Sequence, residues 1–143
     1  MAKAKAAAHT GDGKPVPIAL KRIYEPPAKD DGARILVDRL WPRGISSAKA
    51  RLDLWLRDIA PSDELRHWFA HDPKRWPEFK RRYKAELKGR SDELRPIRDA
   101  LAKGKATLLF AAHDEAHNNA VVVKELVERS ARASAKRKAK TAS

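Results

Sequence analysis

The chain has 143 residues, of which 42% are hydrophobic, and its formal net charge is +13. This length suits one domain with a single core and is too short for two. The sequence contains no cysteine, which excludes disulfides, thiol catalysis and thiolate metal sites and is typical of a reducing cytosol.

The chain shows no segment typical of export or of membrane insertion. Lys3 and Lys5 lie near the start, but no apolar run of signal-peptide length follows them. No stretch approaches the roughly 20 apolar residues of a membrane-spanning helix. We therefore expect a cytoplasmic protein with no membrane partner.

The positive charge is concentrated at the ends of the chain. Residues 129–143 carry six Lys or Arg residues and no acid, and residues 1–17 carry three lysines against one acid. Neither Ala/Lys/Ser-rich end has an apolar stripe, so we predict a flexible tail over 1–17, one domain over 18–128 and a disordered basic tail over 129–143. Such tails could bind nucleic acid weakly and without sequence preference.

Two apolar segments open the domain. Residues 18–24 predict a first strand, which Pro26 and Pro27 close. The next segment contains the apolar run Ile35-Leu36-Val37, whose lack of alternation predicts a central strand buried on both faces. Residues 42–44, Pro-Arg-Gly, then turn the chain out of the sheet.

The middle of the chain predicts helices. Trp55 and Ile59, four residues apart, favour a short helix within the mixed segment 52–59. Ser62 is a good N-cap for the next helix, which stops at residues 71–73. Another helix begins between residues 73 and 77 and ends at Gly89, and a third is capped by residues 91–93 and ends at 103–104.

A second apolar run, residues 106–111, breaks abruptly into polar residues as the first one does. Asp114 is expected to cap a last helix that buries Val123 and Val127. About 60 residues separate the two runs, enough for the crossover that parallel strands require. The predicted fold is therefore a single compact α/β domain with a small, mostly parallel sheet flanked by helices.

Polar residues follow both apolar runs, and parallel strands bring such ends to one edge of a sheet. An acid beside an arginine is held ionised, and free N–H groups at a helix start near residue 115 favour an anion. We predict a pocket for a small anionic or nucleotide-like ligand, in which an arginine or a histidine pairs with Asp38. The ligand-binding candidates are Asp38, Arg39, Arg43, His113 and Asn118, and His117 is expected along the same edge.

Other interpretations of these residues stay open. Asp38 and Arg39 could simply pair with each other, or Asp38 or His117 could act as general acid or base in a small enzyme. His113, Asp114 and His117 lack a further ligand, so we predict no metal site. No Gly-rich phosphate loop or nucleophile elbow is present, and we predict no cofactor.

The chain resembles the YeaO-like branch of the bacterial family filed as domain of unknown function 488. The resemblance covers residues 18–128 and is most specific in the run Asp38-Arg39-Leu40-Trp41-Pro42-Arg43-Gly44, with further matches at residues 21–24, 60–62, 83–87, 107–109 and 117–120. It implies a compact α/β domain with a small sheet flanked by helices, and it implies no established activity.

One departure from the wider family bears on catalysis. The resemblance implies a Cys-His-Arg run at the start of the last helix, where this chain has Asn118, Asn119 and Ala120. If the wider family is enzymatic through that run, this branch has lost the nucleophile. The resemblance therefore favours ligand binding without strong catalysis.

Overall fold

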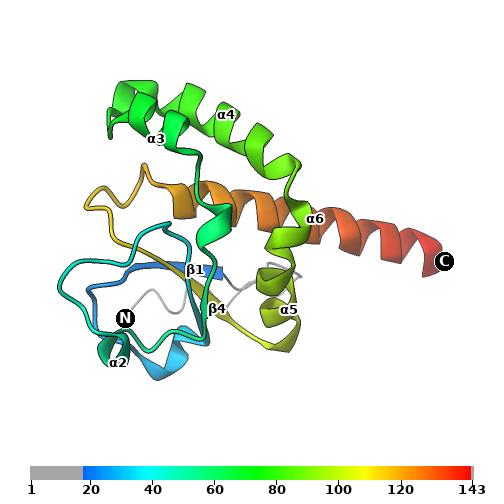
Figure 1. Ribbon diagram of the computed structural model, residues 1–143. Coiled ribbons are helices and arrows are strands. Elements are labelled where there is room, and N and C mark those ends of the chain that lie inside the picture. The colour runs from blue at the N-terminus through cyan, green and yellow to red at the C-terminus, as the bar shows by residue number, and fades with distance from the viewer. Residues whose placement is uncertain (1–17, 143) are drawn as a thin grey trace.

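The structure is a computed structural model that describes the backbone of residues 18–142 and the side chains of residues 18–130. Its centre is a four-stranded sheet in the order β1-β4-β2-β3, formed by β1 (Ile18–Arg22), β2 (Ala33–Leu36), β3 (Leu54–Trp55) and β4 (Ala106–Phe110). Every pair of neighbours is parallel. The prediction of a small parallel sheet in an α/β domain is confirmed (Figure 1).

Both faces of the sheet are covered, which explains why its two central strands lack alternation. Ile35 and Leu108 are paired neighbours that lie in the main core. Leu36 and Leu109, the next pair along, point to the opposite face and belong to a smaller core with Ala50. Because successive side chains in a strand point to opposite faces, a strand covered on both sides needs an unbroken apolar run.

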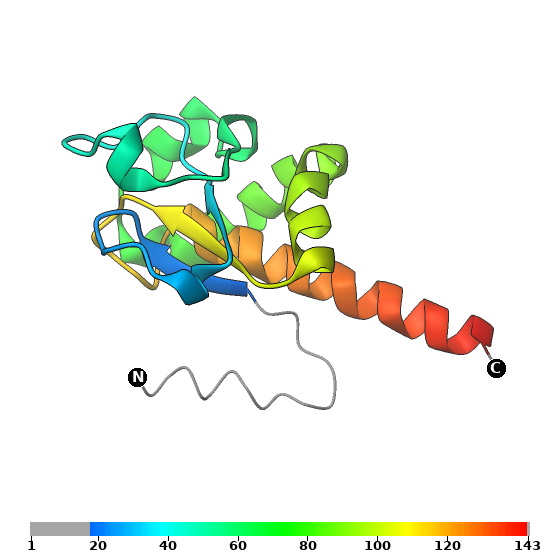
Figure 2. The same cartoon turned by 90° about the horizontal axis from the view of Figure 1, so that it is seen from below.

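Helices cover one face of the sheet, and a short helix with long loops covers the other (Figures 1 and 2). The main core lies under α3 (Asp63–Phe69), α4 (Trp76–Lys88), α5 (Arg95–Lys103) and α6 (Asn119–Ala142). The smaller core is closed by α2 (Ser47–Ala50) and its flanking loops. Within residues 18–142 no helix is long and apolar enough to cross a membrane.

The predicted helix boundaries are largely confirmed. The Ser62 side chain accepts a hydrogen bond from the Leu65 N–H at the start of α3, and Gly89 ends α4. The prediction that residues 91–93 cap the third helix is wrong: Ser91–Leu94 form a 3₁₀ turn, and α5 begins at Arg95 without a side-chain cap. N-terminal caps and C-terminal glycines are local signals, which is why they could be read without tertiary information.

The prediction of a helix within residues 52–59 is wrong. Leu54 and Trp55 form strand β3, paired with Ile35 and Leu36, and a 3₁₀ turn follows at Arg57–Ile59. The Trp55 indole N–H donates to the Asp38 carbonyl at 2.8 Å. Pairing with β2 overrides the four-residue spacing that favoured a helix.

Helix α6 continues through Ala142, over residues that the sequence predicted as a disordered tail from 129 onward. Alanine, lysine and arginine have a high intrinsic preference for helix. This preference does not depend on an apolar stripe, so a search for such stripes does not detect it. The far end of α6 extends beyond the other elements (Figures 1 and 2). The predicted N-terminal tail, 1–17, lies outside the described residues.

Candidate functional site

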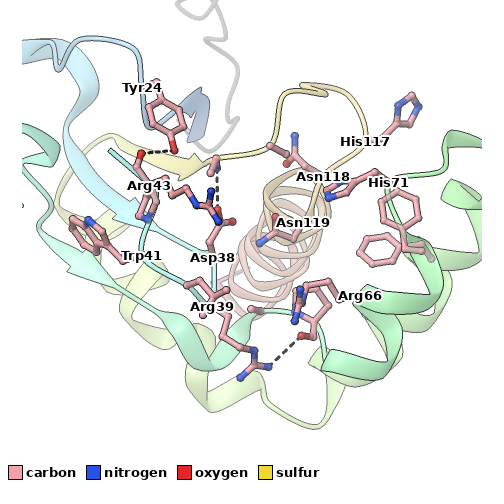
Figure 3. Close-up of a pocket in the computed structure, with 18 residues that line it drawn as sticks. Tyr24, Asp38, Arg39, Trp41, Arg43, Arg66, His71, His117, Asn118 and Asn119 are labelled. Carbon is pink, nitrogen blue, oxygen red and sulfur yellow. Dashed lines mark hydrogen bonds between the residues drawn. The ribbon is translucent and has the colours of Figure 1, made fainter. Parts of the chain in front are cut away.

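A cavity of about 410 Å³ lies at the carboxyl edge of the sheet (Figure 3). Its walls come from the segments that follow β2 and β4, from α3 and α4, and from the start of α6. The prediction that the ends of two parallel strands meet at one edge is confirmed by the pairing of β2 with β4. The lining includes Tyr24, Asp38, Arg39, Leu40, Trp41, Pro42, Arg43, Arg66, Phe69, His71, Phe79, His117, Asn118 and Asn119.

Asp38 lies at the cavity and has no cationic partner among the side chains of residues 18–130. Its Oδ2 accepts a hydrogen bond from the Ala111 N–H at 2.9 Å. Burial raises the pKa of the Asp38 carboxyl, and hydrogen bonds from Ala111 and from the Asn119 side chain oppose this rise in pKa. The prediction that Arg39, Arg43 or a histidine pairs with Asp38 is wrong, because a backbone N–H and an amide take that place.

Arg39 instead reaches toward the start of α3. Its Nη2 donates to the Pro61 carbonyl at 3.2 Å, and its Nε lies 3.7 Å from Oδ1 of Asp63. Oδ1 of Asp63 also lies 3.0 Å from Nη2 of Arg66. Arg39 Nε is buried without a hydrogen-bond partner in the described part of the chain. One exposed carboxylate thus serves two arginines, which leaves a surplus of positive charge beside the cavity.

Arg43 lines the cavity from the loop after β2 and makes no ion pair with any acid among residues 18–130. The Tyr24 hydroxyl donates to the Arg43 carbonyl at 2.9 Å. The guanidinium of Arg22 stacks on the Tyr24 ring at 5.0 Å and donates to the carbonyls of Ala111 and Ala112. These contacts link the loop to the ends of β1 and β4, and no described acid neutralises the guanidinium of Arg43.

His117 is held at the cavity by an acid and an aromatic ring. Its Nδ1 lies 2.9 Å from Oδ2 of Asp114, and its ring packs edge-on against Trp76 with centroids 5.2 Å apart. The hydrogen bond to His117 lowers the pKa of the Asp114 carboxyl. His113 is exposed and does not line the cavity, so the structure does not bring this predicted ligand residue to the site.

Asn118 and Asn119 have different roles. The buried Asn118 side chain donates to the Asp114 carbonyl and accepts from the Val121 N–H, so Asn118 caps α6. The prediction that Asp114 caps this helix near residue 115 is wrong, because Asp114 accepts from the N–H groups of its own turn at 116 and 117. Asn119 donates its amide to the Val37 carbonyl at 2.9 Å, beside Asp38.

The lining of the cavity combines an apolar wall with a polar edge. Among the lining residues described, the only acid is Asp38, three residues are arginine, and none is serine, threonine or cysteine. Phe69 and Phe79 stack with centroids 4.3 Å apart and form part of an apolar wall. Within the described chain, no group of three or more His, Asp or Glu side chains could hold a metal ion.

The sequence did not identify Arg66, Phe69, Phe79 or Asn119 as residues of the site. Arg66 follows Asp63 by three residues, a helical ion-pair spacing that could have linked it to the acid and through the acid to Arg39. Phe69 and Phe79 matched the apolar stripes of their helices, and nothing in the pattern distinguishes a core side chain from one at a cavity wall.

Comparisons with known proteins identify the family of this chain. A family profile described as the inactive DUF488-N3 subclade matches residues 17–143. The uncharacterized protein YeaO of Escherichia coli is 42% identical over 106 residues, which are 74% of this chain and 92% of YeaO. An uncharacterized protein of Mycobacterium tuberculosis is 39% identical over 110 residues, which are 77% of this chain and 92% of that protein. No solved structure matches. The chain therefore belongs to the DUF488 family, within the subclade described as inactive DUF488-N3.

Proposed function

We propose that this protein is a cytosolic binding domain for a small anionic ligand, which it holds in the cavity at the carboxyl edge of its sheet. The observation that carries the proposal is the charge around the cavity: Arg39, Arg43 and Arg66 line it, and Asp38 is its only acid among the described residues. Guanidinium groups bind carboxylates and phosphates through two parallel N–H donors. Pockets of this size with a few polar groups are typical of small-ligand sites.

Binding without strong catalysis fits the composition of the lining. No hydroxyl or thiol nucleophile lines the described cavity apart from the Tyr24 phenol, which is already bound to the Arg43 carbonyl. The family description names an inactive subclade. Asn118, which stands where the resemblance implies the first residue of a Cys-His-Arg run, serves as a helix cap.

The test is a thermal-shift and calorimetric screen of organic anions against the wild type and the double variant Arg39→Gln/Arg43→Gln, which removes the guanidinium that pairs with no described acid and one of those beside Asp63. A ligand that stabilises the wild type is expected to bind the double variant at least tenfold more weakly, because each lost guanidinium removes a charged hydrogen bond of about 1.5 kcal/mol or more. Arg95→Gln is the matched control, since Arg95 is exposed at the start of α5 and lies outside the cavity. Equal binding by all three proteins would refute the proposal.

A small enzyme is the second candidate, and the contact between Asp114 and His117 favours it. An imidazole oriented by a carboxylate is a common general base, and Nδ1 of His117 lies 2.9 Å from Oδ2 of Asp114. If the protein turns over a ligand found in the screen, both Asp38→Asn and His117→Gln are expected to lower kcat at least a hundredfold while binding persists. Unchanged turnover in both variants would refute this candidate.

A further inference from the structure

We propose that the anion bound in this cavity is a monocarboxylate with an apolar body, and that Asp38 binds it in the protonated form, as a hydrogen-bond donor. The inference rests on the proposed function and deepens it by naming the ligand class and the residue that meets its charge. Four features of the cavity support it: the isolation of Asp38, the groups that surround it, the scarcity of free donors and the apolar walls.

Asp38 differs from the other acids near the cavity in having no cation to neutralise it. Asp63 is shared by Arg39 and Arg66, and Asp114 contacts His117. Asp38 makes no ion pair with any residue described, although Arg39 follows it directly in the chain. Its side chain opens to the cavity but is otherwise surrounded by protein, an environment that favours the neutral carboxyl.

The groups that face Asp38 do not reverse the preference of its carboxyl for the neutral form. They are Arg39 and Arg43 from its own loop, Arg66 and His71 from α3 and the turn after it, Tyr83 from α4, and His117 and Asn119 from the start of α6. The Tyr83 hydroxyl donates to the Ile59 carbonyl, and burial raises the pKa of Tyr83, so it stays neutral. The Asn119 amide and the Ala111 N–H favour the ionised carboxylate but do not outweigh burial.

A carboxylate that enters this cavity meets an acid with a raised pKa. Two carboxyl groups in close contact cannot both stay ionised and share one proton instead. The ligand keeps its charge for an arginine, and Asp38 takes up the proton and donates it in a hydrogen bond to the ligand. Binding above the pKa of Asp38 therefore takes up one proton from solvent.

The supply of donors favours a carboxylate over a phosphate. The Ala111 N–H is occupied by Asp38, and the two N–H groups of the Asn119 amide are shared between the Val37 carbonyl and the Asp38 side chain. An arginine fork and one O–H donor suffice for the two oxygens of a carboxylate. A phosphate dianion presents more oxygens and a second charge, and the neutral donors beside Asp38 are already engaged, so its extra oxygens would lie against the Asp38 carboxyl with only one proton to share.

The walls and the entrance favour an apolar body. Phe69, Phe79 and Pro42 line the cavity. The large hydrophobic side chains that stand exposed in the described chain are Tyr24, at 42%, and Leu40, at 68%, and both line this same cavity. An apolar ligand would cover them and remove their surface from water.

The experiment is calorimetry with benzoate as the probe and inorganic phosphate as the comparison. Titrations in two buffers of different ionisation enthalpy count the protons taken up on binding. Wild type is expected to take up close to one proton per benzoate above the pKa of Asp38 and to lose affinity about tenfold for each further pH unit. Phosphate is expected to bind at least tenfold more weakly than benzoate.

Two variants complete the test. Asp38→Asn carries a permanent N–H donor, so its affinity for benzoate is expected to be independent of pH with no proton uptake. Asp99→Asn is the control, since Asp99 is exposed on α5, outside the cavity, and its variant is expected to keep the wild-type pH dependence. The proton count on wild type needs no variant, so the inference stays testable if Asp38→Asn does not fold.

The outcomes separate the inference from the function on which it rests. Benzoate binding without proton uptake would overturn the role of Asp38 and leave the anion pocket standing. Phosphate binding more tightly than benzoate would overturn the ligand class alone. Failure of every anion in the screen to bind would overturn both proposals.

Discussion

Ser62, at the start of α3, connects this helix to α4 through hydrogen bonds to Glu86. Its hydroxyl accepts from the Leu65 N–H at 3.2 Å and donates to Oε2 of Glu86 at 2.6 Å, while its own N–H donates to Oε1 of Glu86 at 2.9 Å. Ser62→Ala removes a helix cap of about 1 kcal/mol and one hydrogen bond to a charged group of about 1.5 kcal/mol. The Ser62 N–H still satisfies one Glu86 oxygen, so we expect a loss of about 2 kcal/mol in the free energy of unfolding.

The assay is urea unfolding followed by tryptophan fluorescence, since the chain has four tryptophans. A loss of about 2 kcal/mol corresponds to a fall in Tm of about 6 °C for a domain of this size. Glu86→Gln keeps the shape and loses the charge, so about half the effect is expected from it. Ser91→Ala, at an exposed serine with no side-chain hydrogen bond among residues 18–130, is the control and should change stability by less than about 0.5 kcal/mol. Equal stability of Ser62→Ala and the control would refute the reasoning.

Three further predictions follow from the core, the cavity acid and the basic end of the chain. Phe79→Ala should lower the free energy of unfolding by about 3 to 5 kcal/mol in urea, because Phe79 is 2% exposed and stacks on Phe69; a loss below about 1 kcal/mol would contradict this. The folded protein holds the Asp38 proton more tightly than the unfolded chain does. The free energy of unfolding of the wild type, relative to that of Asp38→Asn, should therefore be greatest below pH about 4 and should fall as the pH rises through the pKa of Asp38 in the folded protein. Unfolding curves measured at several pH values test this, and a difference between the two proteins that does not change with pH would contradict it. Deleting residues 130–143 removes five cations, so any binding to duplex DNA should weaken. The slope of the logarithm of the binding constant against the logarithm of the salt concentration should become less steep by up to about 4. An unchanged slope would place the phosphate contacts on the domain.

The parts of the fold that could be predicted from the sequence are those governed by local rules or by burial. The runs that contain Ile35 and Leu108 predicted adjacent parallel strands because only a strand covered on both faces needs unbroken apolar residues. Strand β3 was not predicted because two residues, Leu54 and Trp55, are too few to show the alternation typical of a strand. Their extended conformation comes from pairing with β2. The end of α6 was missed because an apolar stripe is a sign of packing and its absence does not exclude a helix.

The location of the site was predictable, and its hydrogen bonds were not. Because β2 and β4 are parallel neighbours, the residues that follow them, Asp38 and His117 among them, lie at one edge of the sheet, independently of the contacts that their side chains make. Which group contacts which depends on distances of a few ångströms across that edge. His113 and His117 are four residues apart, yet only His117 lines the cavity, because the turn that Asp114 closes directs the two residues differently.

The wrong prediction for Asp38 has a cause that bears on function. A buried carboxylate must be paired, hydrogen-bonded or protonated, and the sequence offered Arg39, Arg43 and nearby histidines as partners for an ion pair. Residues adjacent in a chain point in different directions at a strand end, so Arg39 reaches the Pro61 carbonyl, and a backbone N–H from β4's end reaches Asp38. An ion pair within the cavity would have cancelled the charge of both partners. Because Asp38 is satisfied without an arginine, the guanidinium of Arg43 remains unpaired among the described residues at the same cavity, which is where the proposed anion would bind.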